Sequence, residues 1–97
     1  MEQIYRKQFP HGSYSVYGEY GTNGDLILID YHYGSDVNEF WGNDEYEYYF
    51  IIDKDDVQRF VLESLTKGFN TEEKFTLHDL KGMCDEKGIK YTTDTYV

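Results

Sequence analysis

Asp30 and His32 are the side chains whose types and spacing come closest to an acid–base pair. They lie two residues apart in a run typical of a β-strand, so both point to the same side of a sheet and are close enough to interact. Together with Glu47 and Tyr17 they offer ligands for a metal ion, or the acid and base of a small ribonuclease-like enzyme. No recognised ligand spacing accompanies them, and a surface ion pair is the simpler explanation. We therefore predict no enzymatic activity, no metal and no other cofactor.

Two further patterns resemble ion-binding motifs but have structural explanations. The glycines within residues 18–24 lie in a predicted hairpin, whereas a phosphate-binding loop needs them at a turn from strand to helix. The aspartates within residues 53–56 precede a predicted helix and lack the glycine of a calcium loop. Helix capping explains these aspartates better.

Acidic residues are concentrated in the middle of the chain. The formal net charge is -10, and residues 1–18 contribute +1, residues 19–56 contribute -10 and residues 57–97 contribute -1. Many of the eleven tyrosines lie in the same middle segment. This charge attracts cationic surfaces and repels nucleic acids and anionic membranes. We therefore expect a basic protein partner, with no direct nucleic-acid or membrane binding.

A hairpin is predicted around Asn23-Gly24, which suits a two-residue type I′ turn between two strand-like runs. Counting outward from that turn pairs Thr22 with Asp25 and Val16 with Tyr31, which puts an apolar set on one face. The opposite face is then expected to carry Ser15, Tyr17 and Glu19 beside Leu28, Asp30 and His32.

Three more elements are expected after the hairpin. Residues 45–53 alternate as a third strand, with Tyr46, Tyr48, Phe50 and Ile52 toward the core and Glu45, Glu47 and Tyr49 outward. Helical spacing of Val57, Phe60, Val61, Ser64 and Leu65 predicts a helix over residues 55–67. Thr76 and Asp79 predict the start of a second helix, which ends at Gly88.

A closing strand over residues 89–96 completes an α+β domain. Its antiparallel sheet has about four strands in the chain order β-β-β-α-α-β, with two helices packed on one face. Residues 3–9 have the character of a further short strand. The length of 97 residues predicts one domain, residues 1–97.

The outer sheet face and the loop over residues 34–45 form the predicted partner-binding surface. Trp41 lies among acids in that loop, and Trp, Tyr and charged groups are common in binding hot spots. The predicted contact residues are Tyr17, Glu19, Asp30, His32, Asp36, Glu39, Trp41, Asp44, Glu45, Glu47 and Tyr49.

Three features together resemble the small acidic immunity proteins that bacteria make against toxins, many of which inhibit nucleases. They are the acidic aromatic segment Phe40 to Asp53, the helix after it, and the turn into the last strand over residues 85–91. The resemblance implies binding over a basic nuclease cleft, with carboxylates at phosphate positions, as in barstar-like inhibitors. The expected function is thus an immunity protein or inhibitor that neutralises a basic partner such as a toxin nuclease.

Other interpretations of the sequence stay open. They are a phage-type inhibitor that mimics nucleic acid, a small metal-binding protein or enzyme using Asp30, His32 and Glu47, and a homodimeric accessory subunit joined at a sheet edge. Cys84 is the one cysteine and is expected to be a core thiol. The chain shows neither a run of about 18 apolar residues nor a signal-peptide pattern, so we expect a cytoplasmic protein.

Overall fold

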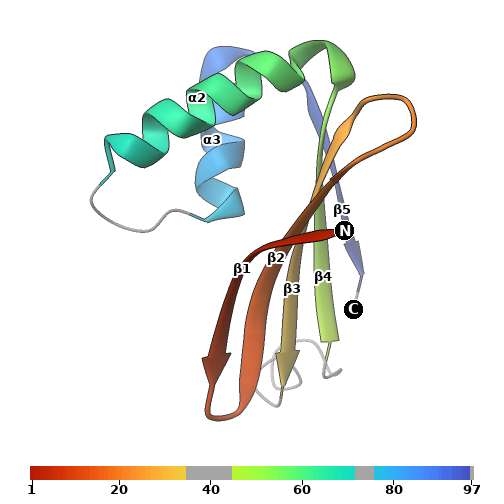
Figure 1. The fold of residues 1–97 in the computed structure, drawn as a ribbon, viewed down its shortest axis with the longest axis vertical. Coiled ribbons are helices and arrows are strands. Elements are labelled where there is room, and N and C mark those ends of the chain that lie inside the picture. Colours follow the sequence, from red (N-terminus) through yellow and green to blue (C-terminus); the bar gives the residue numbers. More distant parts are fainter. Residues whose placement is uncertain (35–44, 72–75, 97) are drawn as a thin grey trace.

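The computed structural model describes residues 1–34, 45–71 and 76–96 (Figure 1). Its sheet has five antiparallel strands in the order β1-β2-β3-β4-β5. A 3₁₀ turn, η1, and two α-helices stand between β4 and β5. The bounds are β1 Glu2–Phe9, β2 Gly12–Tyr20, β3 Leu26–Gly34, β4 Glu45–Ile52, η1 Lys54–Asp56, α2 Val57–Phe69, α3 Leu77–Lys87 and β5 Tyr91–Tyr96.

The predicted α+β class is confirmed, and the sheet has one strand more than the four expected. The additional strand is β1, which pairs with β2 from Glu2↔Gly18 to Phe9↔Gly12. A β-bulge between Gln3 and Tyr5 shifts the pairing by one residue.

Helix ends follow the local sequence closely. Thr76 caps α3. Its side chain accepts a hydrogen bond from the Asp79 backbone N–H, and the Asp79 carboxylate accepts one from the Thr76 backbone N–H, which is the predicted capping box. Gly88 ends α3 with φ +69, a conformation that glycine adopts without steric cost. The predicted start of α2 is two residues early, because residues 54–56 form the 3₁₀ turn that Asp53 caps.

The predicted register of the first hairpin is wrong by one residue. The structure pairs Val16 with Asp30 and Tyr20 with Leu26. Gly21 and Asp25 close a loop of three residues, with Gly21 N donating to Asp25 O at 2.8 Å and Gly24 N to Gly21 O at 3.0 Å. Gly24 has φ +95 and no residue other than glycine in the described chain has a positive φ, so a type I turn with a bulge replaces the type I′ turn.

Because side chains alternate along a strand, this shift turns β3 over relative to its neighbours. Leu28 joins Tyr48, Phe50 and Ile52 on the side that packs against the helices. Val57 and Phe60 of α2, Leu77, Leu80, Met83 and Cys84 of α3, and Ile89 complete this core. Both helices therefore cover one face of the sheet, as expected, and Cys84 is a fully buried core thiol.

The helices cover the sheet only in part. Figure 1 shows α2 and α3 near the end where β4 finishes and β5 begins, while the opposite ends of β1 to β4 extend beyond them. The Cα radius of gyration is 14.1 Å, against about 12.5 Å for a compact domain of this length. Among the described residues, no helix has the length and apolar character needed to cross a membrane.

Candidate functional site

The sheet face opposite the helices carries acids and tyrosines, and no described helix covers it. We call it the open sheet face. Its members are identified by pairing and alternation. They are Gln3, Arg6, Gln8, Ser13, Ser15, Tyr17, Glu19, Ile27, Ile29, Tyr31, Tyr33, Glu45, Glu47, Tyr49, Ile51, Thr92, Asp94 and Tyr96.

Only part of the predicted contact set lies on this face. The structure brings Tyr17, Glu19, Glu45, Glu47 and Tyr49 together there. Asp30 and His32 lie on the helix side, because the shifted register turns β3 over. The remaining predicted contacts, Asp36, Glu39, Trp41 and Asp44, fall outside the described residues.

Ile29 forms an apolar centre for the open sheet face. It lies directly between Tyr17 of β2 and Tyr49 of β4 in the pairing. Directly paired side chains on one face approach within about 5 Å, so the two rings flank Ile29. Ile29 is only 6% exposed, although no described helix covers it. Ile29 thus lies buried between the positions of two tyrosines, of which Tyr49 donates its hydroxyl to Glu47.

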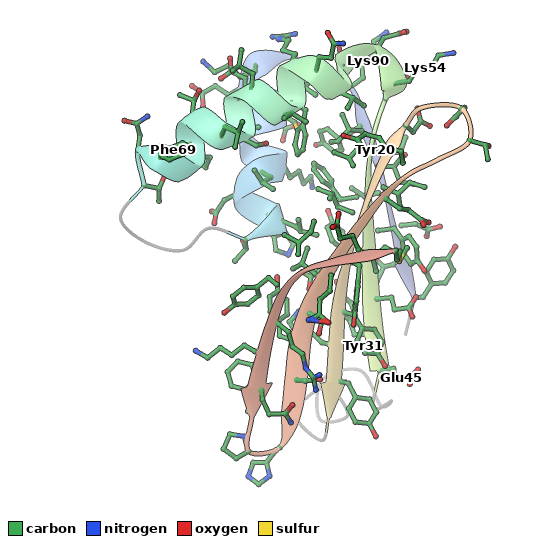
Figure 2. All side chains as sticks on the ribbon, viewed as in Figure 1. Tyr20, Tyr31, Glu45, Lys54, Phe69 and Lys90 are labelled. Carbon is green, nitrogen blue, oxygen red and sulfur yellow. The ribbon has the colours of Figure 1, made fainter. Side chains whose placement is uncertain are left out.

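Three tyrosine hydroxyls donate hydrogen bonds to carboxylates on this face. Tyr31 donates to Glu45 at 3.1 Å, and Figure 2 shows the two residues close together near the start of β4. Tyr49 donates to Glu47 at 2.9 Å and Tyr96 donates to Asp94 at 2.8 Å. The rings of Tyr49 and Tyr96 also pack edge to face at 5.3 Å. Each carboxylate is thereby held in a fixed orientation.

The same contacts keep the hydroxyls protonated. The hydrogen bonds to Glu47 and Asp94 are the main cause that raises the pKa of Tyr49 and of Tyr96. For Tyr31, partial burial is the main cause and the bond to Glu45 adds to it, so its pKa is raised as well. Ionised tyrosines beside carboxylates would repel them. The face therefore presents neutral donors paired with anionic acceptors.

Negative charge dominates the open sheet face. Glu19, Glu45, Glu47 and Asp94 supply four carboxylates, against two cations that the described residues place on this side: Arg6 of β1, and the N-terminal ammonium group of Met1, which lies 3.9 Å from Glu19. Arg6 donates to Gln8 at 3.0 Å. A shallow hollow of about 460 Å³ lies at the end of the face near Ile51 and Thr92. This surface suits the docking of cationic side chains with apolar stems.

Asp30 and His32 are adjacent as predicted, but on the helix side. Oδ1 of Asp30 lies 3.1 Å from Nε2 of His32, and among the described residues this oxygen has no hydrogen-bond partner. Tyr14 donates a hydrogen bond to Asp30. Burial raises the pKa of Tyr14 far above its ordinary value, and the Asp30 charge and this hydrogen bond add to the rise.

The set Asp30, His32 and Glu47 does not assemble into one site. Glu47 pairs with Tyr31 and points to the open sheet face, away from the other two. Within residues 1–34, 45–71 and 76–96, no three His, Cys, Asp or Glu side chains gather closely enough to hold a metal ion. His32 instead packs between Tyr14 and Tyr46, with ring centroids 4.5 Å and 5.7 Å away.

Among the acidic and aromatic residues of the open sheet face, the sequence prediction missed four: Tyr31, Tyr33, Asp94 and Tyr96. Tyr31 and Tyr33 were assigned to the core by the wrong hairpin register. The outward position of Asp94 and Tyr96 could be predicted from the sequence. Side chains alternate along the last strand, so these two residues share a face with Lys90 and Thr92.

Comparisons of this chain with protein-family models, with curated proteins and with solved structures found no match.

Proposed function

We propose that this chain is a small acidic protein-binding module that neutralises a basic protein, such as a toxin nuclease, in the manner of an immunity protein or inhibitor. The observation that carries the proposal is the set of three tyrosine–carboxylate pairs on a sheet face that no described helix covers. The basic partner docks against this face.

Orientation of the carboxylates favours binding. A glutamate on a free surface loses side-chain entropy when it pairs with a partner's Arg or Lys. Here the tyrosine hydroxyls already hold Glu45, Glu47 and Asp94 in place. Less entropy is then lost on association, and each carboxylate keeps further lone pairs for a guanidinium or ammonium group.

The tyrosines supply the apolar part of the same interface. Tyr33 is 49% exposed and Tyr96 54% exposed, so their rings are accessible to a partner. Tyrosine is enriched at interfaces because it adds large contact area at low conformational cost. A surface that mixes such rings with carboxylates resembles the surroundings of a binding hot spot.

Charge reversal tests the proposal. The partner is first captured from a lysate of the source organism on immobilised protein and identified by mass spectrometry. Association rates are then measured for the Glu45→Lys/Glu47→Lys variant. We expect association at least tenfold slower at low ionic strength and a flatter salt dependence, because electrostatic steering acts mainly on the association rate.

The matched control is Glu63→Lys/Glu86→Lys, which changes the net charge equally on α2 and α3. It should slow association only slightly, because these positions lie on the helix side of the sheet. Circular dichroism checks that both variants are folded. Equal slowing in the two variants would show that only net charge matters, and an unchanged rate in the first would reject the open sheet face as the interface.

A further inference from the structure

Helix α2 exposes a stripe of large apolar side chains. Val61 is 37% exposed, Leu62 66%, Leu65 54% and Phe69 88%. Figure 2 shows Phe69 at the end of α2 that lies farthest from the sheet. Single exposed apolar residues are ordinary, but four on one stripe of one helix form a continuous patch.

The stripe has the shape of a ridge beside a groove. Val61, Leu65 and Phe69 follow one another at spacings of four residues, so they line up along one side of the helix. Ser64 and Gly68 form a parallel row of small residues next to them. A shallow groove of about 370 Å³ lies over that row, and the lining residues that the structure describes belong to α2.

We propose that a second copy of this chain occupies the groove, so that two α2 helices pack antiparallel about a two-fold axis near Leu65. Side chains spaced four residues apart form a ridge along a helix. Such a ridge fits into the groove between the corresponding ridges of a facing helix, which is the commonest packing of helices in globular proteins. With a two-fold axis, the ridge of each copy enters the groove of the other. The surface is thus self-complementary, as an isologous dimer interface requires.

The local charge of α2 does not favour the basic partner at this site. Arg59, Glu63 and Lys67 give α2 a net charge of +1 in a chain of net charge -10. A basic protein gains nothing electrostatically on this helix, whereas two α2 helices meet without bringing the acidic segments together. The open sheet faces stay on the far sides of both copies, so this dimer does not depend on the proposed function.

The exposed apolar area sets the expected strength of the dimer. The four side chains offer on the order of 450 Å² in each copy, or about 900 Å² for a pair, before any polar rim is counted. Stable interfaces bury about 1,200–2,000 Å² in total. The dimer should therefore be weak and concentration-dependent.

The sheet edges are poorer candidates for self-association. β1 carries a bulge together with Arg6 and Lys7, and β5 has six residues with Asp94 among them. Bulges, charges and short length are the features that block edge-to-edge pairing of strands.

Sedimentation velocity over a range of protein concentrations tests the dimer. We expect wild-type protein to shift from monomer to dimer with rising concentration. A Leu65→Glu/Phe69→Ser variant should remain monomeric or dimerise at least tenfold more weakly, with an unchanged circular dichroism spectrum. The control is Phe9→Ser/Tyr20→Ser, which removes two exposed aromatic residues on β1 and β2 and should dimerise as wild type does.

Salt distinguishes this contact from partner binding. Added NaCl should leave the dimer unchanged or strengthen it, because its contacts are apolar and the two copies repel each other at long range. Wild-type protein that stays monomeric at every concentration would overturn the proposal. So would a dimer that survives the Leu65→Glu/Phe69→Ser change.

Cross-linking gives a second test without a charged substitution. A Leu65→Cys variant should form covalent dimers with a short bis-maleimide at dilute concentration, because the two-fold axis passes near residue 65. Cys84 is fully buried and should not react in the folded protein. A Tyr20→Cys control should stay uncross-linked, and equal cross-linking of both variants would reject the α2 contact.

Discussion

Asp30 is a buried carboxylate on the helix side of the sheet. It is 5% exposed, and Tyr14 and His32 are two polar groups that the structure places beside it. Burial of a carboxylate is costly unless hydrogen bonds or an opposite charge compensate. The Tyr14 hydroxyl supplies the hydrogen bond, while His32 supplies charge only when it is protonated. Tyr14 therefore stabilises Asp30 more steadily than His32 does.

Removal of the Tyr14 hydroxyl should destabilise the fold measurably. Tyr14→Phe leaves a buried acceptor without its donor, which costs about 1–3 kcal/mol in the free energy of unfolding. The matched control is Tyr31→Phe, whose hydroxyl bonds Glu45 at an exposed position and should cost less than about 0.5 kcal/mol. Urea unfolding at neutral pH measures both values. A loss from Tyr31→Phe as large as that from Tyr14→Phe would contradict the assigned role of Asp30.

The closeness of Asp30 and His32 could be predicted from the sequence, because residues two apart on a strand share a face in any register. Which face of the sheet they occupy could not be predicted. It depends on how β3 pairs with β2, and the two residues carry no information about that. Nor could the Tyr14 contact be predicted, since it joins β2 to β3 diagonally and appears only once the register is known.

The length of one loop decides which face of β3 is buried. Asn-Gly is common in two-residue type I′ hairpins, and glycine also takes the left-handed position of three-residue loops. Gly24 alone has a positive φ in this turn, which selects the second arrangement. The strand cannot correct the ambiguity, because Leu26, Ile27, Leu28 and Ile29 are apolar on both faces. Alternation cannot identify the buried face of a strand when the residues on both faces are apolar.

Other elements were predictable because their signals are local. In strand β4, acidic residues alternate with tyrosines over Glu45, Tyr46, Glu47 and Tyr48, so the acidic positions identify the outward face. The capping box at Thr76 and the glycine at position 88 mark both ends of α3. These patterns need no partner strand, in contrast to the hairpin register.

Substitution of Gly24 tests this view of the hairpin, and substitution of Gly82 in α3 is the control, with an effect of opposite sign on stability. Gly24→Ala forces a side chain into φ +95 and should lower the free energy of unfolding by about 1 kcal/mol or more. Gly82→Ala lies in the exposed interior of α3, where an added Cβ meets no atom within 4 Å, and should raise it by about 0.5–1 kcal/mol. Thermal or urea unfolding measures both. Stabilisation by Gly24→Ala would rule out the left-handed turn.

The two proposed surfaces lie on opposite sides of the molecule. Tyrosines and carboxylates cover the open sheet face, while the apolar stripe belongs to α2 on the helix side (Figure 1). Composition predicted the acidic surface but not the apolar one. Helical spacing marked Val57, Phe60, Val61 and Leu65 as one inward face, yet the structure buries only the first two. Helix α2 extends past the sheet, so its last turns have no core to cover, and periodicity cannot reveal where a sheet ends.

At the scale of the whole molecule, the acidic face should reduce stability. Like charges on Glu19, Glu45, Glu47 and Asp94 repel one another, and a net charge of -10 opposes the compact state. We expect Glu45→Gln/Glu47→Gln to raise the melting temperature by several degrees in about 10 mM salt. In about 0.5 M NaCl the gain should largely vanish, because the Debye length falls to roughly 4 Å.

The control for this prediction is Glu63→Gln/Glu86→Gln on the helices, which removes the same charge away from the acidic face and should stabilise less. Thermal melts give the change in melting temperature of each variant relative to wild type at each of the two salt concentrations. A gain that persists in high salt would point to packing and not to charge. If the first variant is more stable and also loses its partner, the carboxylates are held at a cost to folding for the sake of binding, as is common at functional surfaces.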